Sequence, residues 1–185
     1  MDITGDLIWK VDVEGKIVGT PVVSEDKIYV SRKVDDETGY LSVFFMNGKS
    51  SPPELAASLT PVDGSAPLGP PAISETGMVA VAESWDDGYR EEGSIHLLLP
   101  SERYDELGGQ GNEAYQMILA SSWPFSAITK PVIAEGAIWL GATGANLAGW
   151  QQKDIANVLA GKKQNVNPKW TVQLATSQSD ASQRK

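Results

Sequence analysis

Few residues in this chain have the chemistry of a nucleophile or of a general acid or base. The 185 residues include no cysteine and one histidine, His96. Thiolate nucleophiles, disulfides, cysteine-bound zinc and iron–sulfur sites, and any site that needs two histidines from this chain are therefore excluded. His96 lies in the alternating segment Ser94–Leu99 with no orienting carboxylate close by in sequence, so we expect a strand residue that faces solvent or a loop rather than a general base. Ser121, Ser122 and Ser126 have no partner base, which argues against nucleophilic catalysis.

Candidate sites for cations and phosphates are equally weak. The acidic clusters Asp35-Asp36-Glu37 and Asp86-Asp87-Gly88 lack the alternating oxygen ligands of a calcium-binding loop, so solvated hairpin turns are the favoured interpretation. The glycine-rich segment Gly108–Gly111 neither follows a strand nor opens a long helix, as a phosphate-binding loop does. The sequence therefore predicts no catalytic residue, no cofactor site and no metal site.

The charge balance restricts the partners. Asp and Glu number 24 against 15 Lys and Arg, which gives a formal net charge of −9. Such a surface disfavours a nucleic-acid backbone or an anionic membrane as the main partner. Hydrophobic residues make up 41% of the chain, which is enough for a packed core. No apolar run approaches the ~18 residues of a membrane span. We expect one folded domain, or two very small ones, with no membrane span.

The elements that must position these side chains resemble β-strands. The chain has 18 glycines and 11 prolines, and they separate short apolar runs rich in Val, Ile, Tyr, Phe and Trp. This composition is typical of strands joined by tight turns. Two segments, 101–108 and 154–161, have the capping residues of a short helix. The pattern predicts an all-β chain with strands at Leu7–Val13, Thr20–Val23, Lys27–Ser31, Tyr40–Met46, Met78–Glu83, Ser94–Leu99, Tyr115–Ala120, Lys130–Ala134, Ala137–Gly141 and Trp170–Leu174.

A repeat links these strands. Around Pro21, Pro71 and Pro131 the chain has the order Pro, two apolar residues, a small residue, an acidic turn and an apolar strand. The prolines are 50 and then 60 residues apart, from 21 to 71 and from 71 to 131. One further strand follows each hairpin, and another precedes each proline by about a dozen positions. Four strands per unit is the plan of a β-propeller blade.

At these residues the chain resembles the quinoprotein-dehydrogenase-like β-propellers, also called PQQ-like repeats. Their blades carry a pattern close to D-x-x-T-G-x-x-x-W, then G-x-x-x-x-P-V-V, a turn, and V-Y-V. Residues 2–9 match the first part, short by one residue, and Gly15–Val23 with Ile28–Val30 match the rest. The resemblance covers nearly all of residues 1–175. It implies the fold more specifically than it implies any activity.

Two of the family's tryptophans are replaced here. Leu59 and Leu119 stand where those tryptophans would be, and in the family these tryptophans dock neighbouring blades together. Trp170 keeps its place after Asp154 and Gly161, which echo the first part of the pattern with longer spacing. By analogy with the family, the repeat is expected to be held together at Gly5, Trp9, Pro21, Tyr29, Pro71, Pro131, Trp139 and Trp170.

The tryptophans divide by position. Trp9, Trp139 and Trp170 lie on expected strands, and we expect them to pack between blades. Trp85 and Trp123 fall at loop-like positions, one beside acidic residues and the other beside a proline. Because amphipathic aromatic side chains are enriched at interfaces, these two are the candidates for an exposed contact surface.

In the resembled family, the strand with the tryptophan is the outermost strand of the preceding blade. The resemblance therefore implies a partial propeller with three blades at about 14–62, 63–122 and 123–176, an orphan outer strand of a preceding blade at 1–13, and a polar tail at 177–185. Three twisted blades do not readily close a ring, and open blades leave apolar faces and sheet edges in water. We expect a protein partner or a further chain segment to complete the propeller.

Two classes of function follow from this resemblance. The first is a non-catalytic propeller that serves as a scaffold or protein-interaction module in a larger assembly. The second is a fragment of a quinone- or metal-dependent dehydrogenase whose catalytic residues lie outside this chain. The alcohol type of such enzymes has a vicinal cysteine pair, which this chain cannot supply. A carbohydrate- or peptide-binding propeller that uses the loop tryptophans is a third possibility. The family's members are commonly periplasmic, extracellular or lumenal.

Overall fold

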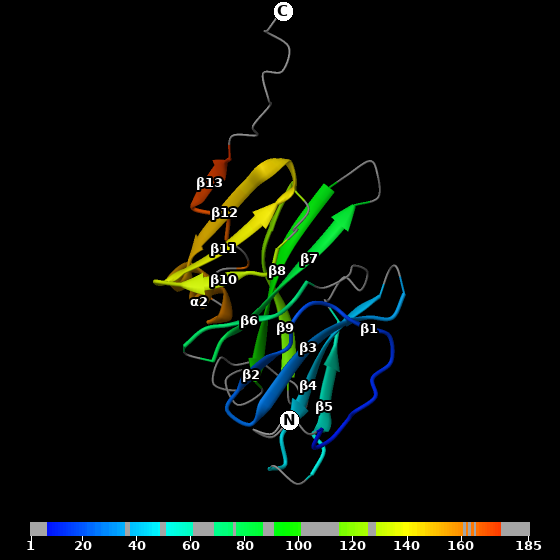
Figure 1. Ribbon diagram of the computed structural model, residues 1–185. Helices are drawn as coiled ribbons and strands as arrows, with labels where there is room; N and C mark the ends of the chain where they lie inside the picture. Colours follow the sequence, from blue (N-terminus) through cyan, green and yellow to red (C-terminus); the bar gives the residue numbers. More distant parts are fainter. Residues whose placement is uncertain are drawn as a thin grey trace, which may run out of the picture.

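The computed structural model describes residues 7–35, 38–48, 51–60, 69–75, 77–86, 91–100, 115–125, 129–160, 162, 164 and 166–174. These residues form three antiparallel β-sheets that follow one another in chain order (Figure 1). Each sheet contains four strands that are consecutive in the sequence and are hydrogen-bonded in that same order. The predictions of an all-β chain and of four-stranded antiparallel units are confirmed.

The strands are grouped as follows. Sheet 1 contains β2 (Val22–Ser24), β3 (Lys27–Lys33), β4 (Gly39–Phe45) and β5 (Glu54–Leu59). A short extra strand of sheet 1, β1 (Lys16–Ile17), pairs with the far end of β3. Sheet 2 contains β6 (Ala72–Ile73), β7 (Val79–Asp86), β8 (Glu91–Pro100) and β9 (Tyr115–Trp123). Sheet 3 contains β10 (Val132–Ala134), β11 (Ala137–Ala142), β12 (Asn146–Gln151) and β13 (Trp170–Gln173). The 3-10 helix η1 (Thr143–Ala145) precedes β12, and the helix α2 (Gln152–Leu159) follows it.

The segment before sheet 1 differs from its prediction. Residues 7–13 form no strand with any part of the chain that the structure describes, which agrees with the expectation that the outer strand at Leu7–Val13 lacks its pairing strands within this chain. Its pairing with a strand from elsewhere stays a prediction. A strand exists only through hydrogen bonds to a neighbouring strand, and none of the described strands pairs with this segment. Burial nevertheless alternates along it: Trp9, Val11 and Val13 are partly buried, and the residues between them are exposed. The indole of Trp9 is therefore only partly covered.

The first strand of each four-stranded unit is an edge strand that is interrupted at a proline. Pro21, Pro71 and Pro131 come directly before the first paired residue of β2, β6 and β10. By register they lie opposite three buried aliphatic residues of the second strand, Val30, Val81 and Leu140. Before each proline the chain bonds again to the next residue of that strand: the Val18 N–H donates to the Ser31 carbonyl (2.8 Å), the Gly69 N–H donates to the Ala82 carbonyl (2.7 Å), and the Gly141 N–H donates to Thr129 Oγ1 (2.8 Å). Because proline has no N–H, a local bulge at this point is the expected result. The three units therefore share one register.

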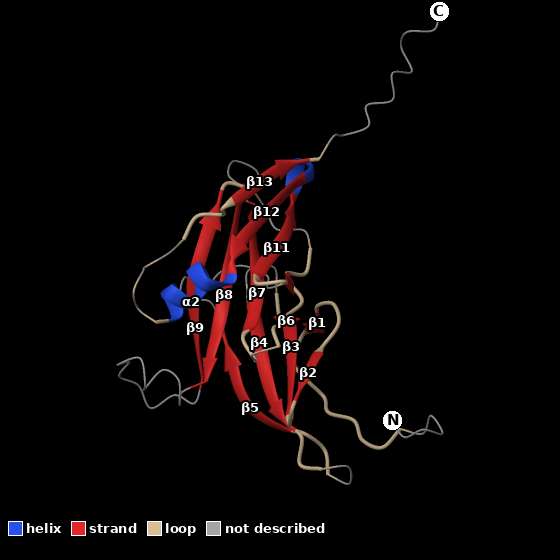
Figure 2. Cartoon of the chain, turned by 90° about the vertical axis from the view of Figure 1, so that its left-hand side faces the viewer, coloured by secondary structure: helices blue, strands red, loops and turns tan. Residues whose placement is uncertain are grey.

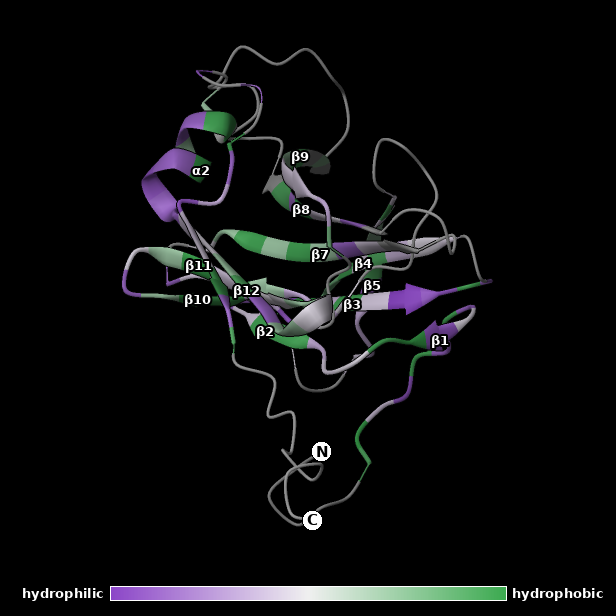
Figure 3. Cartoon of the chain, turned by 90° about the horizontal axis from the view of Figure 1, so that it is seen from above, coloured by the Kyte–Doolittle hydropathy of each residue, from purple (hydrophilic) through white to green (hydrophobic). Residues whose placement is uncertain are grey.

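The shared register gives every sheet two comparable faces. We call the face that carries Val30, Val81 or Leu140 the N-side face and the opposite face the C-side face. The C-side face of sheet 1 packs on the N-side face of sheet 2 through Tyr29, Leu41 and Val43 against Val79, Val81, Leu98 and Met117. The C-side face of sheet 2 packs on the N-side face of sheet 3 through Ala80, Ala82, Ile95 and Leu97 against Ile138, Leu140, Ala148 and Trp150. Seen from above, the apolar colour lies on strands such as β7 and β11 (Figure 3).

Helix α2 closes one side of the second of these cores. Its residues Ile155 and Val158 are buried in the same cluster as Trp150, and the helix lies beside β9 (Figure 2). A short helix was expected at 154–161, with Asp154 as its cap. The helix begins earlier, with Gln151 at the N-cap position, so Asp154 lies in the first turn instead. The other helix expected, at 101–108, lies outside the described residues. None of the helices in the described residues is long and apolar enough to cross a membrane.

Candidate interaction surface

The C-side face of sheet 3 presents apolar side chains to solvent. The paired residues Val132, Trp139, Gly149 and Trp170 form one row across the four strands, since side chains of paired residues lie on the same face. Leu147 and Val172 form part of the next row. Val132 is 57% exposed, Val172 46% and Trp170 36%. Within the described residues, no sheet covers this face.

The middle of this face is a pair of stacked indoles. The rings of Trp139 and Trp170 have centroids 5.3 Å apart and an interplanar angle of 20°. Gly149 lies between them in the row, and a Cβ atom added there would be 2.4 Å from Trp139 Cζ3. Gly149 therefore lets the indole of Trp139 lie flat across the sheet. The Nζ atom of Lys169 is 5.2 Å from the centroid of the Trp170 ring. The face is flat, apolar and aromatic in its centre.

A hollow extends this face towards helix α2. It has a volume of about 520 Å³, and its lining includes Glu135, Ala137, Gln151, Gln152, Lys153 and Trp170. Ala137 and Gln151 are paired in the row next to Trp139 and Gly149, so the hollow continues the exposed face. Its charged groups lie at the rim, beside an apolar centre, which is the usual arrangement of a protein-binding surface.

The other two C-side faces are covered. On sheet 1, Leu41 and Val43 are fully buried against sheet 2. On sheet 2, Ile95 and Leu97 are fully buried against sheet 3. The open face of sheet 3 thus occupies the position that another sheet covers in both preceding units.

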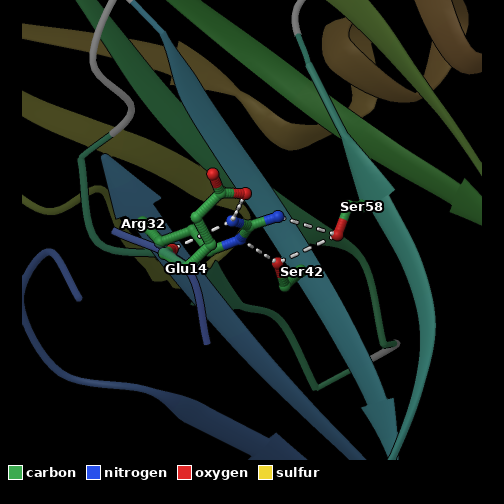
Figure 4. Close-up of polar contacts among 4 residues, drawn as sticks. All are labelled: Glu14, Arg32, Ser42 and Ser58. Carbon is green, nitrogen blue, oxygen red and sulfur yellow. Dashed lines mark hydrogen bonds and ion pairs between the residues drawn. The ribbon is translucent and has the colours of Figure 1, made fainter. Parts of the chain in front are cut away.

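At the other end of the stack, the N-side face of sheet 1 holds a buried cation (Figure 4). Arg32 is 8% exposed and donates through Nε to Ser42 Oγ (2.8 Å), through Nη2 to Ser58 Oγ (3.2 Å) and through Nη1 to the carbonyl of Glu14 (2.9 Å). Its guanidinium lies 4.6 Å from the centroid of the Tyr40 ring. The Glu14 carboxylate is 4.0 Å away and mostly exposed. The charge is therefore held mainly by neutral acceptors and an aromatic face.

Sheet 2 has a polar pair at the equivalent place. Glu83 stands two residues after Val81, as Arg32 stands two after Val30, and His96 pairs with Val81 as Ser42 pairs with Val30. His96 Nε2 lies 2.5 Å from Glu83 Oε2, and the two side chains are 2% and 13% exposed. The pair is on the N-side face of sheet 2, in the interface with sheet 1. Nδ1 of His96 has no hydrogen-bond partner among the described residues.

This geometry decides the role of the histidine. His96 is a strand residue, as predicted, but the expectation that it faces solvent or a loop is wrong, because its side chain is 2% exposed. No carboxylate is close by in sequence, and Glu83, 13 residues away, reaches His96 from the neighbouring strand. A substrate cannot reach a pair enclosed between two sheets, and a general base must lie within hydrogen-bonding distance of the proton that it removes. The pair therefore links the neighbouring strands β7 and β8 of sheet 2 rather than forming an open catalytic site. A strand register, rather than a sequence motif, would have been needed to find it.

The tryptophans are distributed differently from their predictions. Trp123 is 7% exposed and packs against Trp150, with ring centroids 4.8 Å apart, so the expectation of an exposed indole at Trp123 is wrong. The reason is that β9 continues to this residue and places it on the face that meets sheet 3. Trp139 and Trp170 lie on strands as expected, but on the open face rather than between two described sheets. Gly5 and the side chain of Trp85 lie outside the described residues.

A second hollow lies where the ends of sheets 2 and 3 meet. Its volume is about 240 Å³, and its lining includes Trp123, Phe125, Asn146, Asn167, Pro168 and Thr171. The Nδ2 group of Asn146 already donates to the Thr143 carbonyl at 2.7 Å. This hollow is smaller than the one on the C-side face of sheet 3.

Comparison with models of known protein families finds no match for this chain, and comparison with curated proteins finds none either. The features of this chain that bear on its function are therefore its fold and the two end faces, on sheet 1 and on sheet 3.

Proposed function

We propose that this chain is a non-catalytic interaction module built from three consecutive PQQ-like blades, and that it binds another β-sheet through its end faces. The observation that carries the proposal is the open C-side face of sheet 3, with its Trp139–Trp170 stack. The two equivalent faces in the same chain are each buried by a neighbouring sheet.

The energetic argument is the hydrophobic effect. Fully burying a large apolar side chain contributes about 1.5–3 kcal/mol. Val132, Trp170 and Val172 retain a third to more than a half of their surface in water, so a covering sheet would gain a substantial part of this term at each of them. Contiguous exposed apolar surface on a soluble chain is typical of a binding site. The likeness to PQQ-like blades supports the same conclusion, because in that family blades are covered on both faces.

The dehydrogenase alternative places its catalytic residues outside this chain, and no feature of the described residues favours it over an interaction module. The histidine–carboxylate pair of His96 and Glu83 is enclosed between sheets 1 and 2. We therefore propose the interaction module alone.

An apolar dye tests the proposal directly. We expect 1-anilinonaphthalene-8-sulfonate to bind the isolated chain and its fluorescence to be reduced by Trp170→Ser. The matched control is Phe45→Ser, because Phe45 and Trp170 are aromatic residues near strand ends, each 36% exposed and each with a lysine over its ring. The measurement is made at a concentration at which the chain is monomeric, because association would cover this face. Dye binding that is absent from the monomer, or that both variants reduce equally, would contradict the proposal.

A further inference from the structure

The exposed apolar residues are concentrated on the two ends of the stack. On the C-side face of sheet 3 they are Val132, Trp170 and Val172. On the N-side face of sheet 1 they are Ile17, Val23 and Leu55, which register places on the same face as Arg32 and Val30. Six of the ten large hydrophobic residues that are exposed among the described residues thus lie on these two faces.

These two faces correspond to the two halves of the interface that joins neighbouring sheets in this chain. In both interfaces within the chain, a C-side face receives the N-side face of the following sheet. The chain therefore carries one unused copy of each half of this interface, at opposite ends. A second molecule can offer its N-side face to the open C-side face, and it can receive the first molecule's N-side face in return.

We propose that two copies of this chain associate head to tail, with the C-side face of sheet 3 in each copy on the N-side face of sheet 1 in the other. This inference rests on the proposed function and names its partner. Propellers typically have 4–8 blades. One copy supplies three sheets, which is too few, and three copies would supply too many. Two copies give six sheets and close the ring with two identical interfaces, so no apolar end face remains open.

Docking at sheet 1 involves the segment that precedes β1. In the single chain, Glu14 contacts Arg32 through one carbonyl hydrogen bond and a 4.0 Å ion pair. The centre of this face is already buried in the single chain, since Val30, Ser42 and Phe44 are covered there together with Arg32. The segment therefore has to leave the face or move to its rim when a sheet docks. Ile17, Val23 and Leu55 are exposed without any such rearrangement.

Sedimentation velocity on the full 185-residue chain tests the proposal. We expect a dimer with about twice the 19.8 kDa mass of one chain. Val132→Glu on sheet 3 and Val23→Glu on sheet 1 are matched variants, because both valines are 57% exposed and both end faces would bury the new charge. Each variant alone should weaken the association at least about tenfold. Phe45→Glu is the control, since Phe45 is exposed at the C-side edge of sheet 1, away from both end faces, and should leave the dimer unchanged.

Mixing the two variants separates head-to-tail pairing from every other arrangement. A mixture of Val132→Glu and Val23→Glu can form one unaltered interface, from the intact sheet 3 of one variant and the intact sheet 1 of the other. We expect the mixture to recover dimers that neither variant forms alone. If Val132→Glu abolishes the dimer but Val23→Glu does not, two C-side faces pair with each other, and the head-to-tail proposal is wrong.

A monomeric wild-type chain would also overturn the proposal. Its consequence for the proposed function depends on the dye experiment: a monomer that binds the dye at Trp170 has an open face intended for a different protein, whereas a monomer that binds none has no interaction face there. The failure of the dimer and the failure of the interaction module are thus distinguishable.

Discussion

Removal of one partner from the buried Glu83–His96 pair should destabilise the chain far more than removal of both. His96→Ala leaves the Glu83 carboxylate in the interface between sheets 1 and 2 without the imidazole that lies 2.5 Å from it. Glu83→Ala leaves the His96 imidazole, which is 1% exposed, without its hydrogen-bond partner. The double variant leaves neither polar group behind.

The burial of the two side chains sets the magnitudes. Removing the imidazole leaves a largely buried carboxylate without its partner, and we expect His96→Ala to cost about 3 kcal/mol, the upper end of the range for an unsatisfied buried group. Leaving a buried polar group unsatisfied costs about 1–3 kcal/mol, which we expect for Glu83→Ala. The sum of the two single losses should exceed the loss in the double variant by about 1–3 kcal/mol. Sheet 3 gives a precedent for an apolar pair at this position, because the equivalent residues Ala142 and Ala148 are both buried.

Urea unfolding, followed by tryptophan fluorescence at one fixed protein concentration, measures all four proteins. A fixed concentration is needed because association adds to the apparent free energy of unfolding. If the two single losses add to the double loss within about 0.5 kcal/mol, the residues are not coupled and the reasoning fails.

Two further substitutions test, by the same measurement, a close contact at the end of sheet 2 and a hydrogen bond between sheets 2 and 3. Gly93→Ala would place a Cβ atom 2.4 Å from the backbone carbonyl oxygen of Phe125 and should cost about 1–3 kcal/mol. Gly69→Ala is the control, because the nearest atom to its added Cβ is 3.4 Å away, and it should change stability by less than about 0.5 kcal/mol. Similar losses in both variants would contradict the packing described here. Trp150→Phe removes the 2.9 Å hydrogen bond from the indole to Ser121 Oγ and should cost about 1–3 kcal/mol, and it should cost less in a Ser121→Ala background, so an equal loss in both backgrounds would exclude a contribution from this bond.

Sequence reasoning located the repeat because prolines mark it. Pro21, Pro71 and Pro131 stand at one register position of three sheets, and a residue without an N–H is tolerated only at such strand edges. The order of the strands in each sheet could also be predicted, because short turns between apolar runs make strands that are consecutive in sequence neighbours in the sheet. The end of β9 was missed because Pro124 resembled a loop signal, although the strand continues to Trp123.

The parts that sequence reasoning missed depend on pairing between distant residues. Glu83 and His96 are 13 residues apart in sequence and meet only because β7 and β8 pair in one register. The open face of sheet 3 could be expected from the number of strands, whereas the stacking of Trp139 on Trp170 depends on the missing side chain of Gly149.

The short, proline-interrupted edge strands β2, β6 and β10 also affect how this chain can aggregate. An exposed strand edge normally offers unpaired N–H and C=O groups as a template for another chain. Here β2, β6 and β10 have only three, two and three residues, and each follows a proline that has no N–H to donate. Such an edge is too short and too irregular to extend a sheet by adding a foreign strand. Backbone pairing with a foreign strand is thereby disfavoured at these three edges, which leaves the opposite edges at β5, β9 and β13 and the sheet faces, where side-chain shape selects the partner.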